Sequence, residues 1–215
     1  PADGRATILA TAIGEESFSD TAPSNGRFDE GEFDIANDLP EAFVDYDEDG
    51  VRDSNEPYID FNNNSSYDLG DGEFTGLRCQ QSTSAADELA CDTDSINVRD
   101  QVVIVFSAST QIIQFDPSTI NLDNGNVVVN VEITGQNGQI PPAETGISAS
   151  TTLGSIVGPS SYTVRSTSAR GPYVVSFEIE PEDNISSSQT GRLNITVTTP
   201  RDVISRDFAP ISQNP

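Results

Sequence analysis

The stretch Val127-Val-Val-Asn-Val-Glu-Ile-Thr134 places an apolar residue at every second position, which predicts a strand with one buried face. Gly135-Gln-Asn-Gly138 and Pro141-Pro142 follow it and predict a turn. Further short strands occur at the spacing typical of a β-sandwich. They are predicted at residues 147–151, 161–165, 173–179, 193–198 and 203–208. No segment has the i, i+3, i+4, i+7 pattern of an amphipathic helix, so the sequence predicts an all-β protein.

Two more strands are predicted in the N-terminal half, at about residues 5–13 and 98–108. We expect them to form an antiparallel β-hairpin. Its connection, residues 14–97, has no hydrophobic periodicity and is rich in Asp, Asn, Gly and Ser, which predicts a long irregular insertion. The predicted domains are therefore a hairpin with its insertion, residues 1–108, and a sandwich, residues 109–215. Two strands alone bury little surface, so the hairpin must pack on the chain's own sandwich or add to a neighbour's sheet.

The charge of the chain is concentrated in the insertion. The 215 residues carry 35 acids and 10 bases, for a net charge of -25, and every base is arginine. Of the acids, 25 precede residue 101. So polar a segment stays open through self-repulsion unless bound cations neutralise it. The acidic balance also argues against a nucleic-acid partner.

The segment Asp45-Tyr-Asp-Glu-Asp-Gly-Val-Arg-Asp-Ser-Asn-Glu56 matches the twelve-residue calcium loop, with acids at positions 1, 3, 5, 9 and 12 and glycine at 6. Calcium takes six to eight oxygen ligands, which a short loop supplies only around a tight bend. Gly50 supplies that bend. The predicted ligands are the carboxylates of Asp45, Asp47 and Asp49, the carbonyl of Val51, Asp53 directly or through water, and both oxygens of Glu56.

Two weaker copies of the pattern flank this loop. One begins at Asp60, has amides in place of two carboxylates, and ends at Asp71 or Glu73. The other runs from Asp20 to Glu32 and has one extra residue before its Asn-Gly turn. The predicted ligands of the two copies are Asp60, Asn62, Asn64, Ser66, Asp68, Asp71 and Glu73, and Asp20, Asn25, Arg27, Asp29 and Glu32.

The segments between the copies also repeat. Glu41-Ala-Phe-Val-Asp45 matches Glu56-Pro-Tyr-Ile-Asp60 in its acid spacing, which adds Glu41 to the candidate ligands. Three residues between Glu56 and Asp60 leave no room for flanking helices, so the array resembles thrombospondin type 3 repeats and dockerin-like segments. That resemblance implies two to four structural Ca²⁺ ions in place of a hydrophobic core. The alternative is a salt-adapted acidic surface, but the predicted sandwich is nearly neutral.

Cys79 and Cys91 are the only cysteines. A disulfide between them would close a short loop and stabilise it by about 3 kcal/mol in an oxidising compartment; two free thiols in a cytosolic protein are the alternative. No run of about 20 apolar residues predicts a membrane span. We expect a mature or excised piece of an exported chain, whose signal was removed or lies outside this sequence. The expected location is extracellular or at the cell surface, with no membrane insertion.

Catalytic signatures are weak. Without histidine the chain has no Ser-His-Asp, Cys-His or histidine-based zinc site. Carboxylate pairs such as Glu15 and Glu16 are chemically suited to glycoside hydrolysis, but any acidic chain contains such pairs. We predict that the protein is not an enzyme. The Asn-x-Ser/Thr triplets at Asn63, Asn64, Asn184 and Asn194 are explained by chance.

Four stretches carry a resemblance to a known family: Phe115-Asp-Pro-Ser-Thr-Ile120, residues 127–142, residues 147–157 and Leu193-Asn-Ile-Thr-Val-Thr-Thr-Pro200. Together they resemble bacterial immunoglobulin-like modules of the invasin/intimin type. Such modules form β-sandwich rods in surface adhesins. The resemblance implies an immunoglobulin-like sandwich that acts as a calcium-stabilised module of an adhesin stalk or a self-assembling filament.

The implied partners are neighbouring immunoglobulin-like modules or identical subunits, joined by strand addition. A calcium-dependent module that binds a host or surface glycan, or a receptor, is the alternative function.

Overall fold

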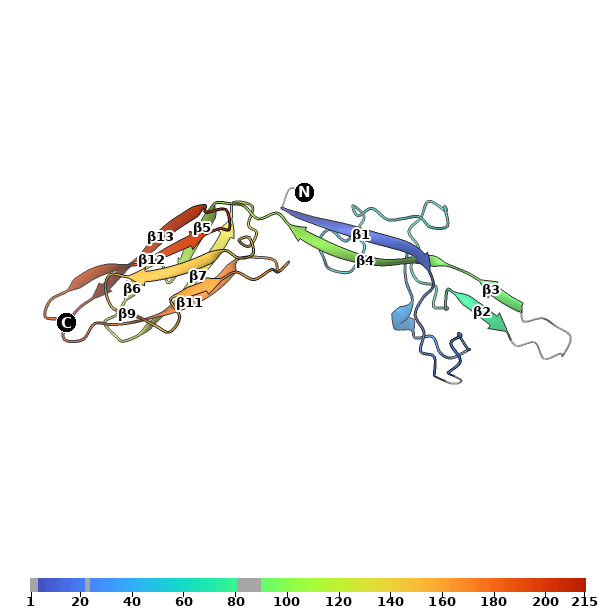
Figure 1. Ribbon diagram of the computed structural model, residues 1–215, viewed down its shortest axis with the longest axis horizontal. Coiled ribbons are helices and arrows are strands. Elements are labelled where there is room, and N and C mark those ends of the chain that lie inside the picture. Colours follow the sequence, from blue (N-terminus) through green and yellow to red (C-terminus); the bar gives the residue numbers. More distant parts are fainter. Residues whose placement is uncertain (1–3, 22–23, 81–89) are drawn as a thin grey trace. The chain divides into compact units, whose positions relative to one another are not determined.

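The computed structural model describes residues 4–21, 24–80 and 90–215. It confirms an all-β protein (Figure 1). The chain forms two compact units. One consists of the N-terminal residues through Ala6 together with Ile104–Pro215, and the other is Thr7–Val103.

The first unit is a sandwich of two sheets. One sheet has the order β5-β7-β11-β9, with β5 at Gln111–Asp116, β7 at Val127–Gly135, β11 at Tyr173–Glu180 and β9 at Ser155–Val157. The other has the order β10-β8-β12-β13-β6, with β10 at Ser161–Thr163, β8 at Gly146–Thr151, β12 at Gln189–Thr198, β13 at Ile204–Gln213 and β6 at Ile120–Asn121.

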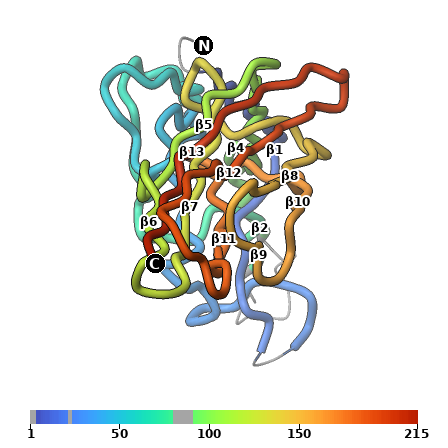
Figure 2. Tube along the Cα trace, turned by 90° about the vertical axis from the view of Figure 1, so that its left-hand side faces the viewer, coloured from blue at the N-terminus to red at the C-terminus, as the bar shows by residue number. Residues whose placement is uncertain are grey.

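The strand order is that of an immunoglobulin-type sandwich. Strands β5, β7, β11 and β9 correspond to the A-B-E-D sheet, and β8, β12 and β13 to the C-F-G sheet. The short β6 pairs in parallel with β13. Strands β12 and β13 pair over ten residues and run side by side in both views (Figures 1 and 2).

The core of the sandwich follows from the alternation along its strands. Val129 and Val131 are fully buried, whereas Val128 between them is 54% exposed. Val129 lies opposite Phe177 of β11, and Phe177 is itself buried. Because successive side chains of a strand point to opposite faces, this period of two is sufficient to place the core. Among the described residues, seventeen buried side chains from both sheets and from the turns beside them form one hydrophobic cluster.

The second unit contains the predicted insertion. Strands β1 (Arg5–Gly14) and β4 (Ile96–Val105) form a two-stranded sheet and run in opposite directions, as predicted (Figure 1). The described part of the chain between them is mostly irregular. It contains the 3₁₀ turn η1 (Ile35–Asn37) and an antiparallel pair of short strands, β2 (Leu77–Gln80) and β3 (Ala90–Thr93).

Several elements were not predicted. Strands β5, β6 and β9 are short or lack clear alternation, and their pairing partners are distant in sequence. Strands β2 and β3 lie in the segment predicted to be irregular, because four residues are too few to show a clear alternation. Cys79 lies directly opposite Cys91 in their ladder, and the two form the predicted disulfide. Part of the loop between them, residues 81–89, lies outside the described residues.

Candidate metal centre

Asp45, Asp47 and Asp49 come together at the tip of the predicted calcium loop, which we call loop B (Asp45–Glu56). One carboxylate oxygen from each lies within 4.8 Å of the others, so the three can hold a metal ion. The amides of Glu48 and Gly50 donate to the two oxygens of Asp45, at 2.6 and 2.8 Å. Gly50 has φ +80°, a conformation that favours glycine, and this turns the loop back on itself.

Glu56 closes loop B with both of its oxygens. Oε1 accepts from the amide of Tyr46 at 2.6 Å, and Oε2 accepts from the amide of Asp53 at 2.9 Å. The Glu56 amide donates to the Asp53 carbonyl at 3.0 Å. Glu56 is 2% exposed. Its carboxylate is therefore fixed next to the first and ninth residues of the loop, the place where a twelfth-position ligand is needed.

Loop A (Asp20–Glu32) has the same arrangement. The amides of Thr21 and Asp29 donate to Oε1 and Oε2 of Glu32 at 2.8 and 3.0 Å, and the Gly26 amide donates to Oδ2 of Asp20 at 2.7 Å. The extra residue before the Asn-Gly turn leaves these bonds intact. Residues 22–23 of this loop lie outside the described part of the chain.

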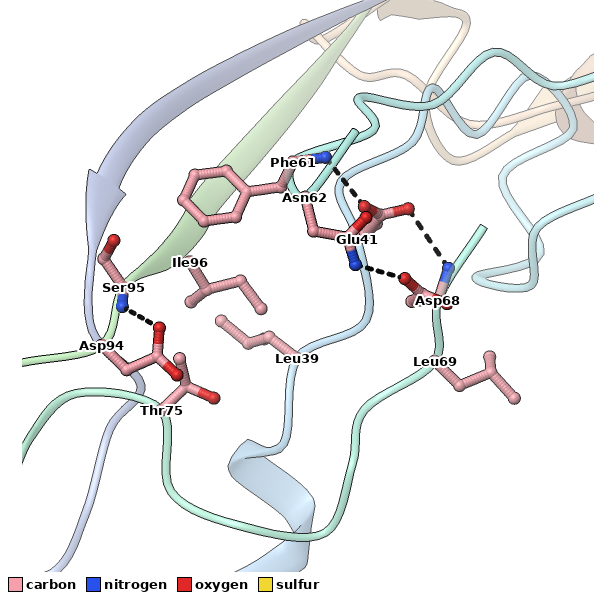
Figure 3. A pocket seen from close by; sticks show the side chains of 10 residues that line it. All are labelled: Leu39, Glu41, Phe61, Asn62, Asp68, Leu69, Thr75, Asp94, Ser95 and Ile96. Atoms are coloured by element: carbon pink, nitrogen blue, oxygen red, sulfur yellow. Dashed lines mark hydrogen bonds between the residues drawn. The ribbon is translucent and has the colours of Figure 1, made fainter. Parts of the chain in front are cut away.

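Loop C begins at Asp60, but the glutamate that closes it precedes the loop in sequence. The amides of Phe61 and Asp68 donate to Oε1 and Oε2 of Glu41 at 2.8 and 3.2 Å, and the Glu41 amide donates to the Asp68 carbonyl at 3.0 Å (Figure 3). Glu41 thus takes the position that the spacing suggested for Asp71 or Glu73. Loop C is defined here as Asp60–Asp68 with Glu41.

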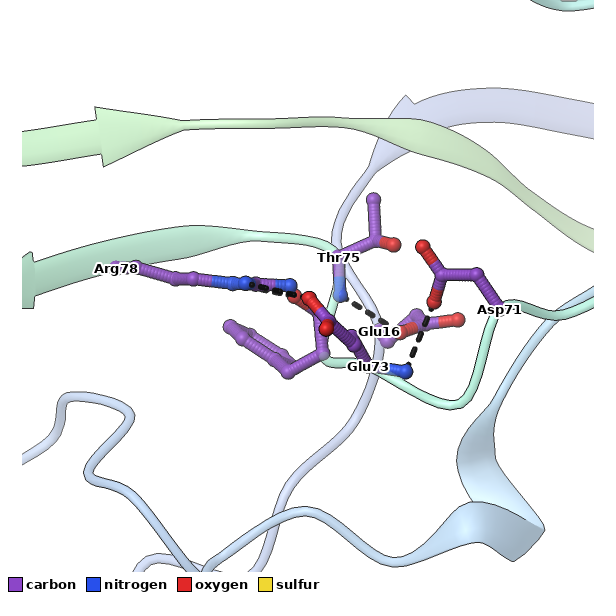
Figure 4. Close-up of polar contacts among 6 residues, drawn as sticks. Glu16, Asp71, Glu73, Thr75 and Arg78 are labelled. Carbon is purple, nitrogen blue, oxygen red and sulfur yellow. Dashed lines mark hydrogen bonds and ion pairs between the residues drawn. The ribbon is translucent and has the colours of Figure 1, made fainter.

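Asp71 and Glu73 belong instead to a fourth loop that the spacing did not predict. The Gly72 amide donates to Oδ2 of Asp38, and the Glu73 amide donates to Oδ1 of Asp71, both at 2.8 Å. Glu16 closes this loop. Its Oε1 accepts from the Leu39 amide at 2.6 Å. Its Oε2 accepts from the Thr75 amide at 2.8 Å (Figure 4). Loop D is therefore Asp38 and Asp71–Thr75 with Glu16.

The four loops share one hydrogen-bond pattern. In each loop, one carboxylate oxygen of the closing glutamate accepts from the amide of the second residue, and the other accepts from the amide of the ninth residue. The amide of the same glutamate donates to the carbonyl of the ninth residue. In each, the sixth residue has positive φ and donates to the first aspartate. These sixth residues are Gly26, Gly50, Ser65 and Gly72, with φ of 75°, 80°, 65° and 81°.

Loops B and C are linked by two paired segments, each of which supplies the first aspartate of one loop and the closing glutamate of the other. Segments 41–45 and 56–60 run antiparallel, joined by a bridge between Phe43 and Tyr58. Glu56 closes the loop that starts at Asp45, and Glu41 closes the loop that starts at Asp60. Loops A and D are related in the same way, since Glu32 closes the loop of Asp20 and Glu16 closes the loop of Asp38. We call B and C the inner pair, and A and D the outer pair.

The eighth residues of paired loops stack on each other. In the outer pair the rings of Phe28 and Phe74 are stacked with centroids 4.2 Å apart. In the inner pair the guanidinium of Arg52 lies 4.7 Å from the ring of Tyr67 and 4.6 Å from that of Tyr58. Small aromatic clusters therefore occupy the space between the paired loops.

The closing glutamates carry buried charge. Glu16, Glu32, Glu41 and Glu56 are 2 to 6% exposed, and Asp45 is 2% exposed. Within the described ranges no arginine forms an ion pair with Glu16, Glu41, Asp45 or Glu56. Amide donors offset part of the desolvation of a buried carboxylate, but an opposite charge is needed to offset the rest. The oxygen-only donor sets suit a hard divalent cation.

Repulsion between the carboxylates of loop B also favours the binding of a cation. Desolvation, and after it the charge of Asp49, raise the pKa of Asp47 above its ordinary value. A cation held by these carboxylates would remove this repulsion.

The remaining predicted ligands lie in their expected loops. Arg27, Val51 and Ser66 are seventh residues, and their amides donate to the fifth side chains Asn25, Asp49 and Asn64 at 2.7 to 2.9 Å. The amide groups of Asn62 and Asn64 both donate to Oδ2 of Asp68 at 2.6 Å. Asp29 and Asp53 are ninth residues of loops A and B. Only Asp71 and Glu73 lie in a different loop from the predicted one.

Glu16 and Asp38 are not among the ligands predicted from the sequence. Glu16 stands four residues before Asp20, as Glu41 stands before Asp45 and Glu56 before Asp60, so the repeated acid spacing could have identified it. Asp38 carries no such signal, because its partner Gly72 lies 34 positions away.

No protein-family model matches the chain, and no curated protein is detectably similar to it in sequence. Among the described residues, no helix is long and apolar enough to cross a membrane.

Proposed function

We propose that this chain is a calcium-stabilised structural module of a bacterial surface adhesin stalk or self-assembling filament, located outside the cell. The observation that carries the proposal is the fourfold pattern, in which a buried glutamate closes each of four loops. Three of these glutamates, Glu16, Glu41 and Glu56, form no ion pair with an arginine in the described part of the chain. Ca²⁺ would supply the missing positive charge, and its preference for carboxylate, amide and carbonyl oxygens fits the residues present. The proposal assigns it a structural role, since it would order a segment that has little hydrophobic interior.

The ligand assignment extends to four ions. Loops A and B would hold calcium through the residues predicted from their spacing. Loop C would use Asp60, Asn62, Asn64 and Asp68 with Glu41. Loop D would use Asp38 and Asp71 with Glu16, and it offers the fewest side-chain oxygens because Leu69 stands where a third-position ligand is expected.

Thermal unfolding and hydrogen exchange with calcium or with a chelator test the structural role. Free calcium at 100 times the dissociation constant stabilises a binding unit by about 2.7 kcal/mol per site. We expect chelation to remove amide protection from residues 15–75 while Val129 and Phe177 of the sandwich core keep theirs. Equal protection of the insertion in both conditions would contradict the proposal.

Strand addition by neighbouring immunoglobulin-like modules or identical subunits is the proposed mode of assembly. In the described part of the chain, β1 and β4 pair only with each other, and they expose Ile8, Val102 and Ile104 by 42 to 57%. An unpaired edge with apolar side chains is a template for another strand. Val102→Lys should abolish assembly seen by light scattering and electron microscopy. Val128→Lys, at a similarly exposed sandwich position, is the matched control; a wild-type chain that stays monomeric at high concentration would refute assembly.

A calcium-dependent glycan- or receptor-binding role is the second candidate. A cleft of about 910 Å³ beside loops A and D is lined by Phe28, Phe33, Phe74 and Arg78. Aromatic faces next to charged groups suit sugar recognition. A glycan screen at constant calcium tests this role. Binding that is lost in Phe33→Ala and kept in Phe208→Ala, a partly exposed sandwich position, would support it. If the chain binds no glycan, this second candidate fails and the structural role is the one that stands.

A further inference from the structure

The inner pair of loops is inserted inside loop D. The Gly72 amide reaches Asp38 across 34 positions in sequence, and the segment from Glu41 to Asp68 accounts for 27 of them. The first residue of loop D therefore precedes the inner pair, and its other central residues follow it. Loop D is complete only when the two ends of the inserted segment are brought together.

The inner pair itself brings those ends together. Its first and last residues form two hydrogen bonds, from the Asp68 amide to Oε2 of Glu41 at 3.2 Å and from the Glu41 amide to the Asp68 carbonyl at 3.0 Å (Figure 3). These bonds belong to the closure of loop C. Just beyond them Gly70 lies so close to Asp38 that a Cβ atom at Gly70 would collide with the carboxylate. Closure of loop C thus delivers Asp71 and Gly72 to Asp38.

We infer that calcium fills the insertion in a nested order, in which the inner pair binds first and its closure then assembles loop D. The inference rests on the calcium-binding function proposed above and adds an order and a coupling to it. It requires no contact beyond those already described.

The size of the coupling follows from chain entropy. Without the inner pair, loop D must close a flexible segment of 34 positions. With the inner pair closed, about 7 flexible positions remain, and since the cost of closure grows as (3/2)RT ln n, the affinity of loop D rises roughly tenfold. Coupling between binding sites is reciprocal. The inner pair nevertheless fills while loop D is still empty, so its own midpoint does not record the coupling.

Site-resolved calcium titration by ¹H–¹⁵N NMR can test the order. The amides of Gly50, Ser65 and Gly72 each donate to the first aspartate of loops B, C and D, at 2.8 Å in every case, so each reports on its own loop. In the wild-type chain we expect Gly50 and Ser65 to respond at lower calcium than Gly72. This comparison needs no variant.

Two matched substitutions at first positions test the coupling. Asp60→Asn weakens loop C and should raise the calcium midpoint of Gly72 roughly tenfold. Asp20→Asn, in loop A, should leave the midpoints of Gly50 and Ser65 unchanged. Unaltered sandwich amides, such as that of Val129, show that each variant is folded.

A Gly72 midpoint below those of Gly50 and Ser65, or one that Asp60→Asn leaves unchanged, overturns the nested order while calcium binding stands. If no reporter responds to calcium in the wild-type chain, the proposed function itself fails. The two failures are therefore distinguishable.

Discussion

The substitution Glu41→Gln tests whether loop C is closed by Glu41 or by Asp71 or Glu73, which follow the loop in sequence. The wild-type carboxylate accepts amides from Phe61 and Asp68. Glutamine keeps one acceptor oxygen and turns an NH₂ group toward the other amide, so a charge-assisted bond is lost. Such bonds contribute about 1.5–3 kcal/mol. The expected result is a roughly 10- to 150-fold weaker calcium affinity of loop C.

Isothermal titration calorimetry combined with the Ser65 amide in NMR spectra measures the loss. We expect one fewer high-affinity ion and a shifted Ser65 response, while the Gly50 amide of loop B still responds. Glu73→Gln is the control, because the Glu73 side chain is 71% exposed and lies in loop D. A Ser65 response that survives in Glu41→Gln and is lost in Glu73→Gln would refute the assignment.

Three further outcomes are expected. Desolvation and the charge of Asp49 raise the pKa of Asp47, so folding without calcium favours the protonated form of this side chain. The chelated protein should therefore lose stability as the pH rises from about 4. Asp47→Asn should flatten this dependence in urea unfolding measured at several pH values. Phe177→Ala should destabilise the sandwich by about 3–5 kcal/mol in denaturant unfolding and leave the calcium stoichiometry unchanged, because Phe177 is 1% exposed in the sandwich core. Gly70→Ala should remove one ion from the calorimetric stoichiometry, because the new methyl group collides with the Asp38 carboxylate; an unchanged stoichiometry would contradict loop D.

Features that depend on residues close together in the chain were predictable from the sequence. Alternation in Val127–Thr134 predicted a strand and its buried face, and the structure buries Val129, Val131 and Ile133. The spacing from Asp45 to Glu56 brought three carboxylates within 4.8 Å in loop B. Prediction from the sequence failed at short strands such as β6, whose two residues gain their place from pairing with Ile211 and Ser212 of β13.

The sequence by itself determined the all-β class, the sandwich core and the residues that form loops A and B, because side-chain alternation and loop spacing are local properties of the chain. Only the tertiary structure gave Glu41 to loop C and Glu16 to loop D. Those glutamates bind the ninth-position amides from 27 and 59 positions away, distances that no local pattern records. Each reaches its loop because paired segments fold back on one another, so packing and not spacing decides which glutamate closes the loop.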